Sequence, residues 1–348
     1  MSHPSTARRW ALGAVAAFTL LSPLAAHAAS GELVVYCTVQ EEWCRPMVNA
    51  FEKATGIKVS MTRKSSGEFY AQIKAEAANP RGDIWWGGTG DPHLQAAEEG
   101  LTDPYVSPRL NELQDWAVKQ ARAAEFRTVG IYAGALGYSY NSVELKKRKL
   151  AEPKCWADLI KPEYKDEVQV ANPNSSGTSY TMLATLVQIM GEAKAFDYLK
   201  ALHKNVNQYT KSGAAPARAV ATGESLVGIT FQHDAVVQAI GGAPVKIVSP
   251  CEGTGYEIGS MSIIKGAKNL ANARKWYDWA LSPEAQAIGA TAGVSYQVPS
   301  NKKSAVPAQA PKLNEIKLIP YDFVKYGSSA ERKRLLSKWD ADVSTQRK

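Results

Sequence analysis

Short apolar strands and longer amphipathic helices alternate in the region that follows residue 30. The strand-like runs are 32–36, 57–62 and 83–86, and the helix-like runs are 46–54, 69–78 and 93–99. An apolar pattern with period two is typical of a strand, and one with a period near four is typical of a helix. The alternation predicts an α/β fold in which parallel-rich sheets are flanked by helices.

Polar residues stand where each of these strands should end. Ligands of open α/β sheets bind at the carboxyl ends of the strands. Thr38 follows the first strand, Ser65 and Ser66 follow the second, and Thr89 follows the third. We therefore expect these four side chains to face a ligand-binding cleft. The alternative is that they are ordinary solvated loop residues.

The glycine-rich, strand-like segment 130–141 indicates a crossing into a second lobe, and the apolar segment 256–264 indicates a crossing back. We predict a first lobe from residues 29–133 and 257–348 and a second lobe from residues 138–254. The two crossing segments would form the hinge. The C-terminal tail, rich in lysine, proline and alanine, is expected to wrap the first lobe.

The most informative motif lies between the strand-like run 167–170 and the buried helix that should follow it. It consists of Ser175, Ser176, Gly177 and Thr178. The first amides of a helix have no partners inside the helix, and the helix dipole places partial positive charge there. Small hydroxylated residues let an anion reach those amides. The same residue types also make plain N-caps, so the motif predicts either a cap or a site for phosphate or carboxylate.

A second loop has the same character. Ser212, Gly213 and Ala214 precede Pro216, whose fixed backbone suits the first turn of a helix. This loop is a further candidate for anion contact, with ordinary capping by Ser212 as the alternative.

Three titratable residues complete the candidate site. His233 and Asp234 follow the buried strand-like run 226–231, and Glu257 opens the second crossing segment. Carboxylates accept hydrogen bonds in pairs and histidine can donate or accept, so these groups suit the recognition of hydroxyls. The alternatives are a solvated turn for His233 and Asp234, a hinge ion pair for Glu257, and a metal site built from all three.

The N-terminus has the pattern of a cleavable export signal. Arg8 and Arg9 precede the apolar run 10–21, and Ala26-His27-Ala28 supplies small residues two positions apart. We predict a signal peptide over residues 1–28 and a periplasmic location, with twin-arginine export as a minor alternative. The apolar run is too short for a comfortable membrane span.

Charge gives only a weak indication of the ligand. The formal net charge of the whole chain is +8, and two of these charges belong to the predicted signal peptide. Basic residues are scattered among acidic ones, so the sequence shows no stripe that would bind nucleic acid. A modest positive excess is compatible with an anionic small molecule.

All four cysteines follow the predicted cleavage site. They are Cys37, Cys44, Cys155 and Cys251. An even count in an exported chain indicates disulfides. Pairing Cys37 with its near neighbour Cys44 would leave Cys155 for Cys251, but three pairings are possible and the sequence does not choose among them. Neither Cys-x-x-Cys nor histidine-rich spacing is present, so we predict no metal site and no cofactor.

Taken together, the chain resembles the periplasmic solute-binding proteins of ABC transporters over essentially the whole mature region. The resemblance is carried by the export signal and by "VVYCTVQEEWCRPMVNAFEKATGIKV", "RGDIWWGG", "AAEEGL", "YNSVELKKRKLAEPKCWADLIKPEYKDEVQVANPNSSGT" and "LSPEAQ". It implies the two-lobed type II fold of that family. Within the family, the chain is similar to the branch that contains ferric-ion-binding and phosphorylated-ligand-binding proteins.

The residues after the strand near Phe231 distinguish these two ligand classes. Ferric binders of this type usually place two adjacent tyrosines there, whereas this chain has Gln232-His233-Asp234. His233, Asp234 and Glu257 instead resemble residues that grip sugar hydroxyls in hexose-phosphate-binding proteins. In that family, serine-rich helix starts hold the phosphate.

The resemblance therefore implies the binding component of an ABC importer that captures a hexose phosphate between two lobes. Its partners would be a membrane permease and an ATPase, and it would act as a monomer. Ferric-ion capture and the binding of an aminoalkylphosphonate or another organophosphate are the alternatives. No catalytic residue is predicted, because His233 and Asp234 do not amount to a nucleophile with its base. A role in chemosensing cannot be separated from uptake by sequence.

Overall fold

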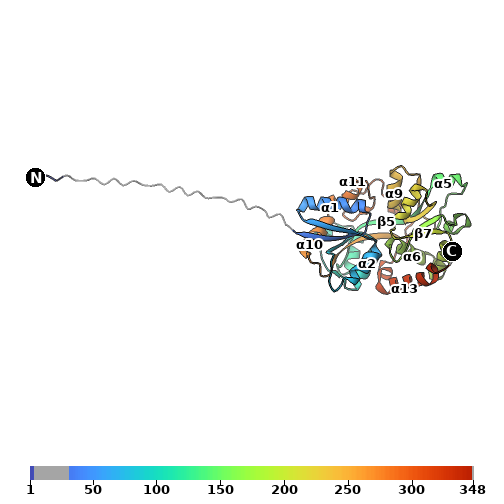
Figure 1. Ribbon diagram of the computed structural model, residues 1–348, viewed down its shortest axis with the longest axis horizontal. Coiled ribbons are helices and arrows are strands. Elements are labelled where there is room, and N and C mark those ends of the chain that lie inside the picture. Colours follow the sequence, from blue (N-terminus) through green and yellow to red (C-terminus); the bar gives the residue numbers. More distant parts are fainter. Residues whose placement is uncertain (4–30, 347–348) are drawn as a thin grey trace.

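The computed structural model describes residues 1–3 and 31–346, and the chain folds into two halves joined near the middle of the view (Figure 1). Apart from its first three residues, the predicted signal peptide lies outside the described residues. The strands are β1 (Glu32–Cys37), β2 (Lys58–Arg63), β3 (Ile84–Trp86), β4 (Thr102–Asp103), β5 (Val129–Asn141), β6 (Val168–Ala171), β7 (Val206–Thr210), β8 (Val227–Phe231), β9 (Val245–Val248), β10 (Tyr256–Ile264) and β11 (Val298–Pro299).

Helices lie around these strands in both halves. The α-helices are α1 (Glu41–Thr55), α2 (Ser66–Ala75), α3 (Gly90–Glu98), α4 (Asp115–Ala123), α5 (Ser142–Lys147), α6 (Gly177–Met190), α7 (Glu192–His203), α8 (Ala215–Thr222), α9 (Gln232–Ile240), α10 (Leu270–Ala280), α11 (Pro283–Thr291), α12 (Phe323–Gly327) and α13 (Ser329–Trp339). The α/β fold class expected from the alternating pattern is confirmed.

One long strand joins the two halves of the sheet. The strand order is β2-β1-β3-β10-β5-β8-β6-β7, with β4, β9 and β11 attached at the sides. The first half of β5 pairs with β10 through Val129–Ala135, and its second half pairs with β8 through Leu136–Tyr140. The β1–β2, β1–β3, β6–β7 and β6–β8 pairs are parallel. The predicted crossing segments thus correspond to β5 and β10, which lie side by side between the lobes.

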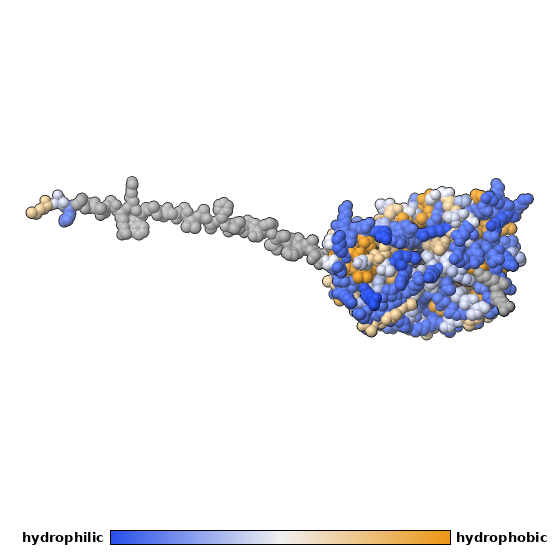
Figure 2. Space-filling view, viewed as in Figure 1, coloured by the Kyte–Doolittle hydropathy of each residue, from blue (hydrophilic) through white to orange (hydrophobic). Residues whose placement is uncertain are grey.

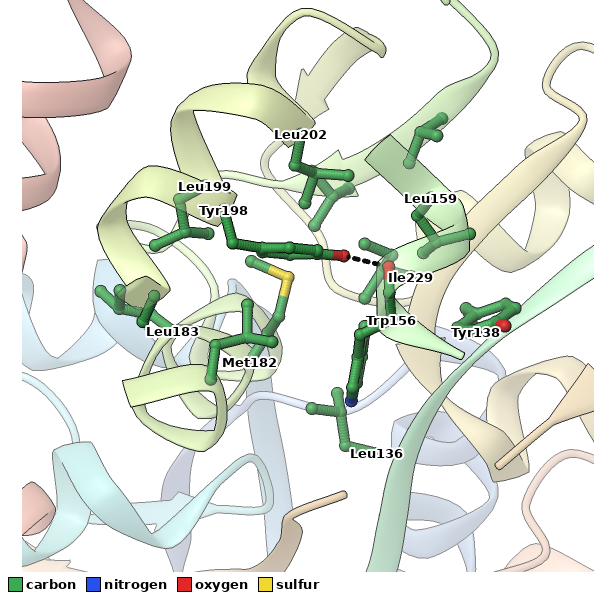
Figure 3. Packing of buried hydrophobic residues seen from close by; sticks show 14 of the residues in the cluster. Leu136, Tyr138, Trp156, Leu159, Met182, Leu183, Tyr198, Leu199, Leu202 and Ile229 are labelled. Atoms are coloured by element: carbon green, nitrogen blue, oxygen red, sulfur yellow. Dashed lines mark hydrogen bonds between the residues drawn. The ribbon is translucent and has the colours of Figure 1, made fainter. Parts of the chain in front are cut away.

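Each lobe has its own hydrophobic core. In the first lobe, β1, β3 and β10 pack against α1 and α10, and both Trp85 and Trp86 are buried as core residues. In the second lobe, α6 and α7 pack on β5, β6 and β8. Figure 3 shows this second core, in which the Tyr198 hydroxyl donates a hydrogen bond to the Trp156 carbonyl oxygen at 2.7 Å. Satisfying that hydroxyl allows a tyrosine to be buried without the cost of a lost hydrogen bond.

The C-terminal tail differs from the expectation that residues 257–348 belong to the first lobe. Tyr321, Tyr326 and Trp339 are buried in the hydrophobic cluster of the second lobe, although α12 also packs against α3 of the first lobe. The Tyr180 hydroxyl of α6 donates to the Tyr326 carbonyl oxygen at 2.7 Å. The tail therefore spans both lobes, because its aromatic side chains cover apolar surface that α6 and α7 would otherwise expose.

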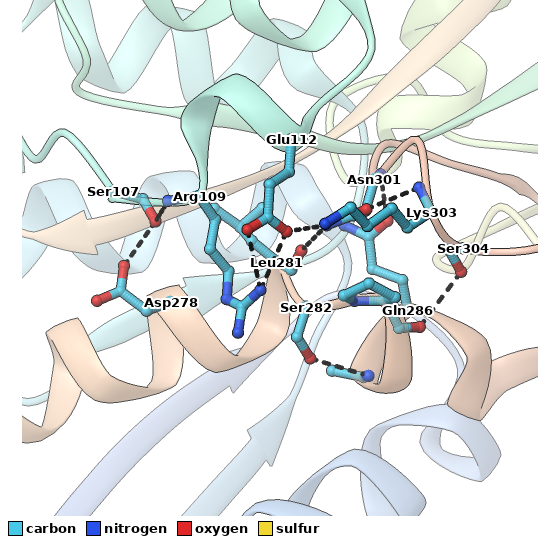
Figure 4. Close-up of polar contacts among 12 residues, drawn as sticks. Ser107, Arg109, Glu112, Asp278, Leu281, Ser282, Gln286, Asn301, Lys303 and Ser304 are labelled. Atoms are coloured by element: carbon cyan, nitrogen blue, oxygen red, sulfur yellow. Dashed lines mark hydrogen bonds and ion pairs between the residues drawn. The ribbon is translucent and has the colours of Figure 1, made fainter.

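The segment before this tail is fixed to the first lobe by a polar network. The Asn301 side-chain amide donates to Glu112 and to the Leu281 carbonyl oxygen at 3.0 and 2.8 Å, and the Asn301 backbone amide donates to Gln286 at 2.7 Å (Figure 4). Because Asn301 follows β11 closely, the network also fixes the nearby Gln297, which reaches the space between the lobes.

The surface seen in Figure 2 is mainly hydrophilic, with apolar side chains in small groups. Within residues 1–3 and 31–346, no helix combines the length and the apolar character needed to cross a membrane.

Candidate functional site

A cavity lies between the two lobes, beside the crossing strands β5 and β10. It is lined by Thr38, Val39, Gln40, Arg63, Ser65, Ser66, Gly88, Thr89, Tyr132, Ser176, Gly177, Thr178, Ser212, Gly213, Ala214, Phe231, His233, Asp234, Glu257 and Gln297. The structure thus brings all of the candidate ligand-binding residues to one cavity, with the exception of Ser175.

Ser175 lies just outside the cavity lining. Its hydroxyl donates to the backbone carbonyl oxygens of Asn172 and Lys211, and its own carbonyl oxygen accepts a hydrogen bond from the Gly67 amide. Ser175 precedes the N-cap Ser176 by one residue, so its side chain turns back to the loop instead of toward the helix axis. Its assignment as a phosphate contact is therefore not supported by the geometry.

Seven lining residues are additional to those expected from the sequence. They are Val39, Gln40, Arg63, Gly88, Tyr132, Phe231 and Gln297. Arg63 is the last residue of β2, and the end of that strand was already a candidate position. For Gln297 the sequence carries no signal, because a long-range network brings it to the cleft. Tyr132 is a crossing-strand residue, as expected, but its buried ring also forms part of the cavity wall.

Several helices begin at this cavity. Residues at the N-terminal ends of α1, α2, α3, α6, α8 and α9 all contribute to its lining. Each helix start offers amides without intrahelical partners and a partial positive charge. Several such ends directed at one cavity favour a bound anion more strongly than any single helix start does.

Several hydroxyl groups at these helix starts are not used for capping, although Ser65 forms a capping box with Glu68 at the start of α2. Ser176 is the N-cap of α6, yet its side chain makes no capping hydrogen bond. The N-cap of α8 is Ala214 rather than Ser212. Thr89, the N-cap of α3, is buried, and its hydroxyl has no hydrogen-bond partner among the described residues. Plain capping therefore does not explain these side chains.

Two glycines leave space for the hydroxyl groups at these helix starts. A Cβ atom on Gly177 would lie 1.9 Å from the Thr89 hydroxyl oxygen, and one on Gly213 would lie 2.0 Å from the Thr178 hydroxyl oxygen. Any larger residue would displace these hydroxyl groups. The two glycines thus allow backbone and hydroxyl donors to gather around a small group.

Arg63 adds a cation beside these helix starts. Its Nε donates to the Val39 carbonyl oxygen at 2.9 Å, and its Nη2 donates to the Ser212 hydroxyl at 3.1 Å. Burial lowers the pKa of the Arg63 guanidinium, but arginine remains charged in proteins. Arg63 therefore links the first lobe to the second and places positive charge beside the helix starts.

The cavity is also lined by His233, Asp234 and Glu257. His233 Nε2 lies 3.8 Å from Asp234 Oδ1 and 3.7 Å from Glu257 Oε1, and all three residues are buried. Asp234 accepts hydrogen bonds from Thr230 at 3.0 Å and from the Gln40 side-chain amide of the other lobe. These contacts hold the acid groups at fixed positions but leave them at the cavity wall. Because they are buried, the alternative of a solvated turn does not apply.

Burial also changes the protonation of this group. The pKa of Glu257 is raised well above its usual value by desolvation and then by the neighbouring Asp234. The pKa of His233 is lowered by desolvation. Burial therefore favours the uncharged forms of both groups, which can donate as well as accept hydrogen bonds. Such a mixture of donors and acceptors suits hydroxyl groups better than a metal ion.

The lobes touch directly around the cavity. The Gly67 amide donates to the Ser175 carbonyl oxygen at 3.0 Å, and the Ser65 hydroxyl donates to the Lys211 carbonyl oxygen at 3.0 Å. At the surface, Arg218 pairs with Glu42 at 3.0 Å. These contacts describe a closed arrangement of the lobes.

The four cysteines form two disulfides, Cys37–Cys44 and Cys155–Cys251. This pairing is the local one among the three that the sequence allowed. Cys155, Cys251 and Glu252 also lie close enough together to be considered as metal ligands. Both of these sulfur atoms are engaged in the disulfide, so the group offers no thiolates.

Comparison with known proteins agrees with this geometry. Residues 89–326 match the family described as bacterial extracellular solute-binding protein. An uncharacterised protein of Haemophilus influenzae is 46% identical over 90% of this chain and 91% of its own length. The periplasmic binding protein AfuA from Actinobacillus pleuropneumoniae, solved with fructose 6-phosphate bound, is 45% identical with a TM-score of 0.89, covering 91% of this chain and 99% of AfuA. The periplasmic binding protein P5PA is 40% identical with a TM-score of 0.88, covering 90% of this chain and all of P5PA.

Members of this family bind solutes and are not enzymes, so the expectation that this chain captures a small molecule without transforming it is confirmed. A periplasmic location follows from the same relationship. The match extends over most of the chain, and the two-lobed fold agrees with that of the related structures. The chain belongs to the family of bacterial extracellular solute-binding proteins, in the branch that resembles periplasmic binding proteins of ABC transporters.

Proposed function

We propose that this protein is the periplasmic component of an ABC importer for a phosphorylated sugar, with a hexose phosphate as its ligand. The observation that carries the proposal is a single cavity lined by two chemically different sets of groups. One set consists of helix starts, hydroxyl groups and Arg63, and the other consists of His233, Asp234 and Glu257. A sugar phosphate has the same division between an anion and a set of hydroxyls.

The first set of groups, which consists of helix starts, hydroxyl groups and Arg63, suits a phosphate group. At the start of α6, Ser176, Gly177 and Thr178 line the same cavity as Ser65 and Ser66 at the start of α2. Ionised phosphate oxygens only accept hydrogen bonds, and both backbone amides and hydroxyls can donate to them. Arg63 can balance part of the charge. Donors from both lobes line this cavity, so binding would favour the closed arrangement.

The second set of groups, which consists of His233, Asp234 and Glu257, suits sugar hydroxyls. Each hydroxyl donates one hydrogen bond and accepts others. The carboxyl groups of Asp234 and Glu257 and the imidazole of His233 supply acceptors and donors for such groups. A Cβ atom on Gly134 of β5 would lie 2.5 Å from His233 Nδ1, so the imidazole packs against the crossing strand. Its Nε2, beside both acids, is the nitrogen available to a ligand.

The same chemistry weighs against the alternatives. A ferric ion prefers hard anionic oxygens, yet the cavity lining sets the acids Asp234 and Glu257 beside a histidine and an arginine. An aminoalkylphosphonate fits the phosphate-binding groups but makes less use of the pair Asp234 and Glu257. The relative AfuA, which was solved with fructose 6-phosphate, supports the sugar phosphate.

The remaining parts of the proposal follow from the class of protein. The N-terminal segment 1–28 would direct export and be cleaved. The monomer would close on its ligand and present both lobes to a membrane permease, and an ATPase would drive uptake.

The test is a comparison of ligands by calorimetry and thermal unfolding of the mature protein. We expect fructose 6-phosphate or another hexose phosphate to raise the melting temperature, because a ligand present at a thousand times its Kd stabilises the native state by about 4 kcal/mol. Free hexoses and inorganic phosphate should have much smaller effects. A shift with ferric citrate or 2-aminoethylphosphonate, and none with any hexose phosphate, would contradict the proposal.

A further inference from the structure

The loop between β1 and α1 is enclosed by a disulfide. Cys37 is the last residue of β1 and Cys44 lies in the first turns of α1, so the bond spans the loop Thr38-Val39-Gln40. Both cysteines are buried, each with 1% of its surface exposed. All three residues of the enclosed loop line the cavity between the lobes.

The enclosed loop meets three separate parts of the binding site. The Thr38 hydroxyl donates to the Trp86 carbonyl oxygen at 3.2 Å and also to that of Gly87, at the end of β3. These bonds set the side of the cavity on which the Thr38 hydroxyl lies. The Thr38 amide also donates to Trp86, at 3.0 Å.

The next two loop residues contact Arg63 and Asp234. The Val39 carbonyl oxygen accepts the 2.9 Å hydrogen bond from Arg63 Nε, which orients that guanidinium toward Ser212. The Gln40 side-chain amide donates to Asp234 of the second lobe. A shift of this short loop would therefore disturb the positions of Arg63 and Asp234 and one contact between the lobes.

The two disulfides differ in what they can do for the protein. Cys37 and Cys44 are 7 residues apart, whereas Cys155 and Cys251 are 96 apart. In the chain-entropy description, a disulfide stabilises the folded state more when it closes a longer loop. The short loop therefore contributes less to global stability, and its main consequence is local order next to the cavity.

We propose that the Cys37–Cys44 disulfide is a positioning bond that holds the Thr38–Gln40 loop in its ligand-binding geometry before the ligand arrives. The inference rests on the proposed function, because it takes a hexose phosphate as the ligand of the cavity. A loop that is ordered in advance loses less conformational freedom on binding. A loop that occupies the binding geometry for about a tenth of the time weakens the apparent affinity about tenfold.

The test uses the mature oxidised protein and two double variants. Cys37→Ala with Cys44→Ala removes the short disulfide, and Cys155→Ala with Cys251→Ala is the matched control. The turn next to Cys251 keeps independent support, because the Thr254 amide donates to Lys317 at 3.0 Å and its hydroxyl donates to Leu136 at 3.1 Å. Fructose 6-phosphate is the probe, measured by calorimetry, with amide hydrogen exchange of residues 38–44 as the second readout.

We expect the Cys37→Ala, Cys44→Ala variant to bind about tenfold more weakly, with faster amide exchange in 38–44 that slows again when the ligand saturates the site. The control should lose more thermal stability while its Kd stays within twofold of the wild-type value. A third variant, Cys37→Val with Cys44→Ala, refills part of the buried volume and should show the same loss of affinity, which separates loop order from core packing.

Equal affinity of the first variant and the wild-type protein would overturn the proposal, as would an equal loss of affinity in the control. Recovery of full affinity in the refilled variant would assign the effect to packing and would also overturn it. The proposed function fails in a different way, since the wild-type protein itself would then not bind fructose 6-phosphate or any other hexose phosphate.

Discussion

The Gly67 amide in the first turn of α2 donates a hydrogen bond of 3.0 Å to the carbonyl oxygen of Ser175, which lies just before α6 in the other lobe. Backbone thus meets backbone across the cleft, next to the proposed phosphate site. The approach is close enough that a Cβ atom on Gly67 would lie 2.1 Å from the Asn174 carbonyl oxygen. Closure of the two lobes therefore depends on the absence of a side chain at position 67.

Replacing this glycine should block closure without disturbing the first lobe. We expect Gly67→Ala to weaken binding of fructose 6-phosphate by about a hundredfold, because a loss of about 3 kcal/mol corresponds to that factor. Calorimetry would give the Kd, and small-angle X-ray scattering with saturating ligand would show whether the lobes still close. Gly241→Ala at the end of α9, where a Cβ atom would meet backbone at 3.3 Å, is the control. A closed, tightly binding Gly67→Ala protein would contradict this account of closure.

Asp234 should recognise the sugar and not the phosphate. It accepts a hydrogen bond from Thr230 at 3.0 Å and faces the cavity beside His233. Hydrogen bonds to charged groups contribute about 1.5–3 kcal/mol, so Asp234→Ala should weaken fructose 6-phosphate roughly ten- to a hundredfold. Weak binding of inorganic phosphate, measured by competition, should change little. The exposed Asp115, replaced by Ala in a control, should leave both affinities unchanged. An equal loss of affinity for both ligands would show that Asp234 does not recognise the sugar hydroxyls.

Arg63 should act on the phosphate. Its two hydrogen bonds, to Val39 at 2.9 Å and to the Ser212 hydroxyl at 3.1 Å, use different nitrogens of one planar group. A lysine keeps the charge but cannot make both contacts at once. We expect Arg63→Lys to weaken fructose 6-phosphate and inorganic phosphate by a similar factor, about tenfold, in calorimetric titrations. Arg45→Lys on the exposed side of α1 is the matched control. A loss confined to the sugar phosphate would place Arg63 outside the phosphate site.

Much of this site was predictable because strand ends and helix starts have clear sequence patterns. The junction around Ser176 and Thr178 combines an alternating strand, small hydroxylated residues and an apolar helix, and both side chains line the cavity. The same pattern included Ser175, whose hydroxyl instead bonds to the backbone of its own loop and of Lys211. Sequence patterns locate such a loop more reliably than they orient its members.

Other features depend on contacts between distant parts of the chain. Arg63 ends a strand, but only the packed structure shows that its side chain turns toward Ser212. Gln297 is brought to the cleft by the network around Asn301. The tail was assigned to the first lobe, although Tyr321 and Trp339 belong to the core of the second. Composition indicated a surface segment there, and it gave no sign of the apolar surface that these rings cover.

A last prediction concerns Asp91, a buried acid at the start of α3 that lies between the lobes and the tail. It accepts hydrogen bonds from Tyr321 at 3.3 Å and from Thr181 at 3.4 Å, and desolvation raises its pKa to about 6 even though Arg332 lowers it. An acid whose pKa is raised on folding binds its proton more tightly in the native state. Its contribution to stability is therefore complete below about pH 4 and is lost as the pH rises past 6.

The measurement is the free energy of unfolding in denaturant for the wild-type protein and for Asp91→Asn, each from pH 4 to pH 7.5. A shift of about two pKa units corresponds to about 3 kcal/mol, so the stability of the wild-type protein relative to the variant should fall by roughly that amount across this range. Asp115→Asn, at an exposed site, should show no such trend. A difference between the wild-type protein and Asp91→Asn that stays constant with pH would mean that Asp91 is already ionised at pH 4 in the folded protein, held so by the buried Arg332.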